Sequence, residues 1–195
     1  MIVGYHIIFS AYGFWLPNDP RGSWSDFVGS WELLRFGRAT KTSERRSLAY
    51  DEHDARLRLA AKRALKYPAV NFTGLQARSI GRAFGKYFTK KNVDVWACAI
   101  LPDHVHLVTG RLPMMVEQLV IQLKGDATQE LEGEGIHPLA RFRKPGSRVP
   151  KCWGRGQWKV YLDPDHVESA IRYVERNPLK EGKPRQTWSW VKKRP

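Results

Sequence analysis

Cysteine, acidic residues and long apolar runs are all scarce in this chain of 195 residues. Cys98 and Cys152 are its only cysteines, which excludes a disulfide framework and a four-thiolate zinc site. No segment approaches the ~18 consecutive apolar residues that a membrane-spanning helix needs, so we expect neither a transmembrane protein nor a membrane partner. Residues 1–10 have no basic stretch before their apolar residues and no small-residue cleavage site. We therefore expect a reduced, cytoplasmic protein without a secretory signal.

The shortage of acidic residues gives the chain a strong positive charge. Its 33 Lys and Arg against 19 Asp and Glu leave a net charge of +14. An excess of this size favours a polyanionic partner, because each neutralised phosphate releases counterions. We therefore expect binding to nucleic acid and association with the nucleoid; a basic surface that serves only solubility is the alternative.

The segment between Gly135 and Leu162 has no Asp or Glu at all. Basic side chains that bind phosphates are interleaved there with aromatic rings. Trp153 and Trp158 are candidates for stacking on unpaired bases, although core packing is the favoured role of either ring. Several Pro and Gly residues exclude the long amphipathic helix of a membrane face. We predict a basic loop at 136–157 and expect these residues to bind nucleic acid: Arg141, Arg143, Lys144, Arg148, Lys151, Arg155 and Lys159.

The spacing of apolar residues predicts an α+β fold. Strands are expected at 5–11, 93–101, 103–109 and 157–162, and helices at 51–66, at 73–90, from Pro113 onward, and from Pro164 to about Asn177. Pro178 sets the last boundary, because proline disfavours the helical state of the residue before it. This order predicts an antiparallel sheet with helices packed mainly on one face. We expect a single domain over residues 1–195, with a long irregular loop at 12–31.

Two histidines separated by one residue lie in the strand predicted at 103–109. Successive side chains of a strand point to opposite faces, so His104 and His106 project from one side of the sheet and Val105 from the other. Two imidazoles placed in this way can bind one divalent metal ion with little reorganisation, whereas half-buried histidines held by hydrogen bonds are the alternative. A histidine-triad hydrolase would need a third alternating histidine, where Val108 stands, and a two-histidine phosphoesterase would need a second His-x-Thr/Ser element, which the chain lacks.

The last predicted helix carries a tyrosine and an asparagine four residues apart. At 100° per residue, Tyr173 and Asn177 lie about 40° from each other, on the flank of the apolar stripe. A phenol and an amide on this flank can reach the sheet; a packing tyrosine and a helix-ending asparagine are the alternative. The stripe itself consists of Val167, Ala170, Ile171 and Val174.

Together, these features resemble the HUH single-strand endonucleases. The chain is most similar to the IS200/IS605-like tyrosine transposases and, within them, to the REP-associated tyrosine transposases. The resemblance is carried by Leu-Pro-Asp-His-Val-His-Leu-Val at 101–108, by Tyr-Val-Glu-Arg-Asn-Pro-Leu-Lys-Glu-Gly at 173–182, and by Tyr-Gly-Phe-Trp-Leu-Pro-Asn-Asp-Pro-Arg-Gly at 12–22. Asn177 matches the REP-associated branch, whereas the IS200/IS605 transposases proper tend to have Gln at that position.

The resemblance implies a ferredoxin-like fold and a transposase, that is, a metal-dependent endonuclease and strand transferase acting on single-stranded DNA beside a hairpin. It implies that Tyr173 is the nucleophile, forming a 5′-phosphotyrosine link, and that His104, His106 and Asn177 hold Mg²⁺ or Mn²⁺. Both a monomer and a homodimer stay open. A domesticated single-strand DNA-binding protein that no longer cuts and an RNA-binding protein on the same fold are the alternatives.

Overall fold

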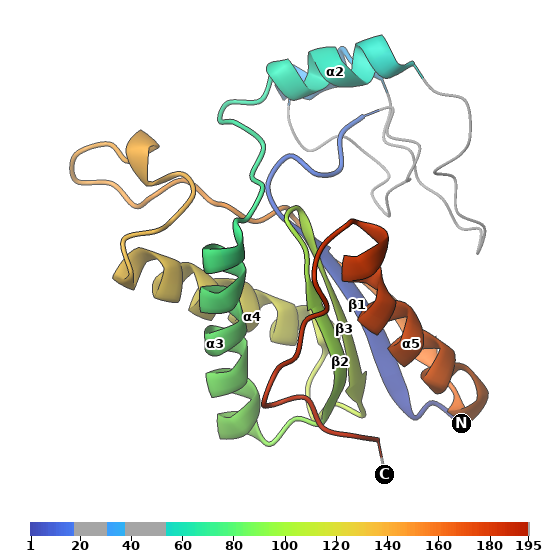
Figure 1. Ribbon diagram of the computed structural model, residues 1–195. Helices are drawn as coiled ribbons and strands as arrows, with labels where there is room; N and C mark the ends of the chain where they lie inside the picture. The colour runs from blue at the N-terminus through green and yellow to red at the C-terminus, as the bar shows by residue number, and fades with distance from the viewer. Residues whose placement is uncertain (18–30, 38–53, 195) are drawn as a thin grey trace.

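The computed structural model describes residues 1–17, 31–37 and 54–194 (Figure 1). Most of the loop predicted at 12–31 and the first residues of the helix predicted at 51–66 lie outside these ranges. Within them the elements are, in chain order, β1 (Gly4–Ser10), α1 (Trp31–Leu34), α2 (Ala55–Arg63), α3 (Gly74–Lys91), β2 (Val95–Ile100), β3 (His104–Gly110), α4 (Val116–Gly133), the 3-10 turn Ala140–Phe142, β4 (Trp158–Leu162) and α5 (Pro164–Lys180).

The four strands form one sheet in the order β2-β3-β1-β4, and every neighbouring pair is antiparallel. With α3 before β2 and α4 between β3 and β4, the chain follows the ferredoxin-like order β-α-β-β-α-β, to which α5 is added. The predicted α+β fold with an antiparallel sheet is confirmed. Because β1 lies between β3 and β4, it borders the strand that carries the paired histidines.

The two faces of the sheet are covered by different helices. α3 and α4 lie on one face and α5 on the other (Figure 1). The larger core lies under α3 and α4, where alternate residues of the two central strands (Ile7, Phe9, Val105 and Leu107) are fully buried. The other residues of β3 point to the opposite face of the sheet, toward α5. The predicted apolar stripe of α5 packs on this face against residues of β2 and β3. Two of the three long helices therefore share a face, and the histidines point to the face with the third.

The predicted N-caps of α3 and α5 are present, but the predicted start of α4 is wrong. Thr73 and Asp163 each accept hydrogen bonds from backbone N–H groups of the turn that follows. α4 begins at Val116 and not at Pro113. Leu112 and Met114 both pack against the larger core, and the extended backbone of the N-cap Met115 (φ −67°, ψ 143°) makes Val116 the first helical residue.

The predicted end of α5 is also wrong, because the helix continues through Pro178 to Lys180. Proline lacks the N–H that would bond to the carbonyl one turn earlier, so the helix loses one hydrogen bond near its end, and the bonds that close the helix beyond Pro178 offset this loss. The backbone N–H of Lys183 then bonds to the carbonyl of Pro178, and Gly182 supplies the positive φ, +66°, at which the helix stops. The additional turn places Glu181 at the end of the helix.

The C-terminal tail after α5 returns across the edge of the sheet. The side-chain amide of Gln186 bonds to both the N–H and the carbonyl of Ile100, on edge strand β2. The rings of Trp188 and Trp190 lie where side chains at Gly81 and Gly85 of α3 would stand. The tail therefore covers an edge strand and joins α5 to α3. Among the described residues, no helix combines the length and hydropathy needed to cross a membrane.

Candidate active site

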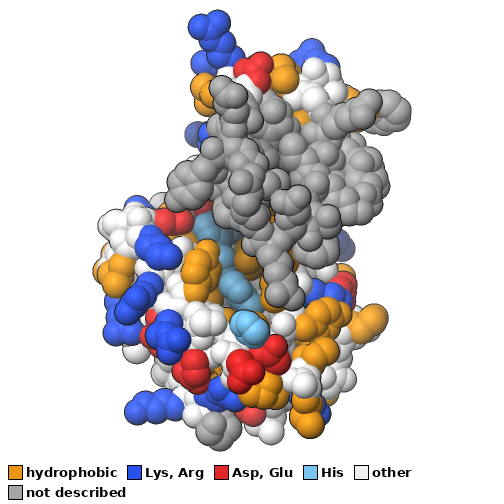
Figure 2. Space-filling view, turned by 90° about the vertical axis from the view of Figure 1, so that its right-hand side faces the viewer, with side chains coloured by type: hydrophobic (Ala, Val, Ile, Leu, Met, Phe, Trp, Pro, Cys, Tyr) orange, Lys and Arg blue, Asp and Glu red, His pale blue; other side chains and the backbone are white. Residues whose placement is uncertain are grey.

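The paired histidines converge on a common point on the α5 face of β3. The Nε2 atoms of His104 and His106 are 3.0 Å apart. His106 is 4% exposed, and His104 is covered on another side by the ring of Phe14, whose centroid lies 4.9 Å away. Figure 2 shows histidine side chains in a row on this face of the molecule, with basic and acidic side chains around them.

The opposite nitrogens of the two rings have their own partners. Nδ1 of His104 lies 2.7 Å from Oδ1 of Asp103, and Nδ1 of His106 lies 3.0 Å from Nε2 of His6. A carboxylate only accepts, so His104 donates from Nδ1 and presents a lone pair at Nε2. Cis ligands of an octahedral ion at about 2.1 Å lie about 3 Å apart, which is the spacing of the two Nε2 atoms. The donor set therefore fits a divalent cation.

Burial keeps the imidazoles of His6 and His106 uncharged at neutral pH. It lowers the pKa of His6 to about 4. It also lowers the pKa of His106 well below its usual value, and the neighbouring His104 and His6 add to this effect. Metal binding requires the neutral form of histidine, so burial holds His106 in the state that a cation needs.

Tyr173 extends from α5 against this cluster. Its ring centroid lies 5.5 Å from that of His106 and 5.9 Å from that of His6, in both cases edge-on. The side chain is 44% exposed, so a substrate can reach the phenol. Burial and, secondarily, the negative charge of Glu181 raise the pKa of Tyr173, while the ammonium of Lys180 lies 4.9 Å from the ring centroid.

Asn177 lies one turn beyond Tyr173 and is 7% exposed. Glu181 follows one further turn along the same side of α5, and its carboxylate forms a group with Asp103 and His104 in which the ligand atoms lie within 4.8 Å of one another. Because both Tyr173 and Glu181 lie against the histidine strand, Asn177 between them faces that strand as well. The structure thus brings His104, His106 and Tyr173 together, and it places Asn177 on the same side of α5, one turn beyond Tyr173.

Three further residues of the site were not singled out in the sequence: His6, Asp103 and Glu181. Asp103 stands beside the histidine pair, and its adjacency is a usable signal. In the first strand, His6 alternates with the apolar Ile7, and this alternation predicts that His6 faces away from the larger core. Its proximity to His106 follows only from the structure, in which Ile8 of β1 pairs with His106 of β3. A helix that ends at about Asn177 leaves Glu181 outside α5, whereas the observed helix continues to Lys180 and has Glu181 as its C-cap.

The predicted basic loop does not surround the histidines. In Figure 1 it extends beyond α4, on the side away from α5. Arg141, Arg143, Lys144, Arg148, Lys151 and Arg155 are exposed. Lys159 is half-buried on β4 and forms an ion pair of 2.7 Å with Glu117 of α4. Most of the predicted cations therefore form a surface separate from the site.

The last part of the basic loop returns to β1, the strand that pairs with the histidine-bearing β3. The N–H of Gly154 bonds to the carbonyl of Ser10, whose partner across the sheet is His104. The ammonium of Lys124 donates to the carbonyls of Gly154 and Gly156 and holds the segment in place; burial lowers the pKa of this lysine to about 8. The exposed side chain of Arg155 therefore belongs to the part of the loop nearest the site.

The two tryptophans of the loop have different surroundings. Trp153 is 8% exposed and packs on Phe9 and Phe72, with centroid distances of 5.7 and 4.8 Å. Trp153 is therefore a core residue, which is the role that the sequence favours over stacking. Trp158 is half-buried and pairs with Ile8, which in turn pairs with His106, so it lies on the face of the sheet that carries the histidines.

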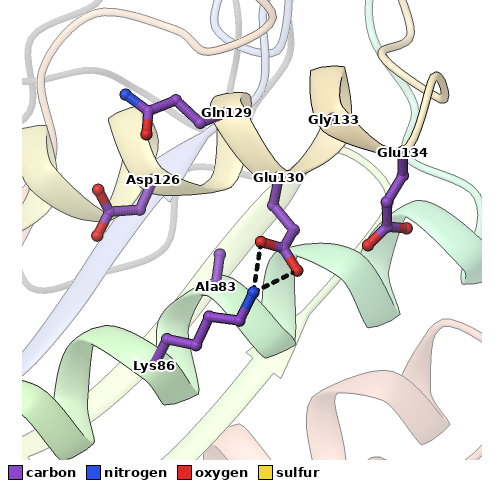
Figure 3. Close-up of a pocket in the computed structure, with 7 residues that line it drawn as sticks. All are labelled: Ala83, Lys86, Asp126, Gln129, Glu130, Gly133 and Glu134. Atoms are coloured by element: carbon purple, nitrogen blue, oxygen red, sulfur yellow. Dashed lines mark hydrogen bonds and ion pairs between the residues drawn. The ribbon is translucent and has the colours of Figure 1, made fainter.

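A separate hollow of about 380 Å³ lies between α3 and α4. Its charged side chains are mainly acidic, and the ammonium of Lys86 reaches the carboxylate oxygens of Glu130 at 2.8 and 2.9 Å (Figure 3). Asp126 and Glu134 add two more carboxylates. This lining does not favour phosphate, and the hollow belongs to the face opposite the histidines.

No protein-family model and no curated protein matches the chain. Among solved structures, it resembles a REP-associated tyrosine transposase bound to a REP hairpin, with 11% identity, a TM-score of 0.48, and 92% of this chain and 68% of the other covered. It also resembles a candidate transposase from Deinococcus radiodurans R1, with 14% identity, a TM-score of 0.36, and 91% of each chain covered. The function is therefore inferred from the residues of the site.

Proposed function

We propose that the protein is a transposase-type enzyme, a metal-dependent endonuclease and strand transferase that acts on single-stranded DNA through Tyr173. The observation that carries the proposal is the contact between a half-exposed phenol and a pair of converging imidazoles. The Tyr173 ring lies 5.5 Å from that of His106, whose Nε2 atom is 3.0 Å from Nε2 of His104. A phenol on α5 and two imidazoles on β3, groups that could serve as nucleophile and metal ligands, lie side by side, and this supports the proposal.

His104, His106 and the side-chain oxygen of Asn177 would hold Mg²⁺ or Mn²⁺. Two nitrogen ligands and one oxygen favour Mn²⁺ by ligand softness, and Mg²⁺ is favoured by abundance. When bound, the ion neutralises charge on the scissile phosphate and orients it. Asp103 supports this set by accepting the Nδ1 proton of His104 at 2.7 Å.

The chemical step that we propose is an in-line attack by the Tyr173 hydroxyl oxygen on phosphorus. A bond forms between phosphorus and the phenol oxygen, the bond from phosphorus to the 3′ oxygen breaks, and the leaving oxygen takes up a proton. The 5′-phosphotyrosine link conserves the energy of the phosphodiester, so rejoining needs no ATP. A phenol with a raised pKa has to lose its proton in this step, and the ammonium of Lys180 beside the ring favours the phenolate.

The exposed cations of the basic loop are proposed to bind the DNA backbone away from the cut. Arg155 lies on the part of the loop that returns toward His104, while Arg141, Arg143, Lys144, Arg148 and Lys151 extend the positive surface outward. Lys159 is held by Glu117 and contributes less than the others. The resemblance of the two sequence motifs adds the expectation of a hairpin beside the cut site.

The test is formation of a covalent adduct with labelled, hairpin-bearing single-stranded DNA in the presence of Mg²⁺ or Mn²⁺. We expect the wild type to form the adduct and Tyr173→Phe to form none. Tyr161→Phe is the matched control, because Tyr161 is 54% exposed on β4 and contacts Tyr5, away from the histidines. Tight binding without an adduct in either metal would favour a non-catalytic binder, and preference for the RNA version would favour an RNA-binding protein.

A further inference from the structure

His6 is a third imidazole in the site and comes from a different strand. Ile8 of β1 pairs with His106, so His6, two residues earlier, lies on the same face of the sheet. Its Nε2 atom is 3.0 Å from Nδ1 of His106, and the two rings stack with their centroids 5.2 Å apart. The same ring contacts Tyr173 edge-on at 5.9 Å. His6 therefore touches both a proposed metal ligand and the proposed nucleophile.

The bond between His6 and His106 can exist with the proton on either ring. A neutral imidazole has one donor nitrogen and one acceptor nitrogen. If His106 carries its proton on Nε2, this proton points at His104 and the cation site is closed. If His106 carries it on Nδ1, the Nε2 lone pair faces that of His104 and the site is open to a cation. The second form needs an acceptor at Nδ1, and His6 Nε2 is the atom within hydrogen-bond distance there.

Because His106 is buried, the acceptor that Nε2 of His6 offers to its Nδ1–H group is important for the protonation form of His106. His106 is 4% exposed, so water does not replace a missing partner at low cost. Without His6, an Nδ1–H group on His106 would be buried and unsatisfied in the form that binds a cation. The form with the proton on Nε2, which can donate to His104, would then be favoured over it.

We propose that His6 is a positioning residue, which accepts the Nδ1 proton of His106 and so directs the Nε2 lone pair of His106 toward the metal. The inference rests on the proposed function, because it requires a divalent cation between His104 and His106. The two ligands then have matching supports on their outer nitrogens: Asp103 for His104 and His6 for His106.

The experiment uses Mn²⁺ alone, without DNA, and measures its affinity for the full chain by titration calorimetry and by electron paramagnetic resonance. His6→Phe keeps a ring of similar size and removes the acceptor, whereas His6→Gln can place an amide oxygen near the position of Nε2. We expect His6→Phe to weaken Mn²⁺ binding about 10–100-fold and His6→Gln to stay within about threefold of wild type. His166→Gln, at an exposed histidine of α5, is the control and should not change the affinity.

A second readout identifies the proton itself. Imidazole nitrogen resonances of the Mg²⁺-loaded wild type should show His106 protonated at Nδ1. A His6→Phe variant that melts like wild type and binds Mn²⁺ equally well would overturn the inference, as would a His6→Gln variant as weak as His6→Phe. If His6→Phe does not fold, the His6→Gln affinity and the proton position decide: weakened binding or His106 protonated at Nε2 overturns it. A wild type that binds neither ion overturns the proposed function as well, whereas intact binding with no effect of His6 overturns only this inference.

Discussion

The two faces of the central sheet use the same strands for different purposes. On the α3 and α4 side, Val105 and Leu107 of β3 are fully buried in the larger core. On the α5 side, the neighbouring His104 and His106 form a polar chain with Asp103 and His6. Alternation along one strand thus allows a well-packed core to fix imidazoles in position without exposing them fully to water.

The division of roles between the two faces of the sheet can be tested by replacing with Ala one residue of β3 on each face. Leu107→Ala should lower the free energy of unfolding by about 2–5 kcal/mol, because it leaves a cavity in the larger core, while the adduct rate per folded molecule stays unchanged. His104→Ala should slow adduct formation at least about 100-fold through loss of the metal site. Urea denaturation and single-turnover kinetics measure the two effects; a comparable loss of rate in both variants would contradict a division of labour between the faces.

The α5 face should also make stability depend on pH. Burial lowers the pKa of His6 to about 4 and that of His106 in the same direction. Below pH about 6.5 these histidines bind protons in the unfolded chain but stay neutral in the native protein. The free energy of unfolding therefore falls as the pH drops from about 6.5 to about 4. We expect His6 to account for about 1–3 kcal/mol of this loss. Urea titrations at several pH values should show a shallower decline in His6→Gln, and equal slopes would argue against a desolvated His6.

The basic loop should give the smallest effect, because it lies apart from both faces. Replacing Arg143 and Lys144 by Ala removes two exposed cations, so DNA affinity should fall severalfold and the salt dependence by about two units of slope. The adduct rate at saturating DNA should not change. Lys90 and Lys91, exposed at the end of α3, supply the control pair. An equal loss in both double variants would mean that total charge, and not the loop, sets the affinity.

Local patterns predicted what depends on local interactions. The apolar stripe of α5, the caps at Thr73 and Asp163 and the shared side of His104 and His106 follow from helical and strand periodicity, which any stretch of sequence displays. The antiparallel sheet followed from the order of the elements.

What the sequence did not predict depends on contacts between distant segments. His6 joins His106 through pairing of β1 with β3, across 100 positions of sequence. The sequence favours core packing for Trp153, but its ring partners Phe9 and Phe72 depend on distant segments, and an isolated bridge joins Trp153 to Ala11. The turn beyond Pro178 forms because Gly182 and Lys183 close it, and this closure outweighs the local preference of proline.

The C-terminal tail gives the helix of the proposed nucleophile a second attachment. α5 is joined to β4 at its start, and beyond its end Gln186 and the two tail tryptophans fasten the chain to β2 and α3. Tyr173 lies between these two anchorages. Under the proposed function, a DNA strand linked to the phenol of Tyr173 would pull on a helix that is attached at both ends. Tension from the nucleic acid would then be distributed over the whole domain while the cut DNA ends are exchanged.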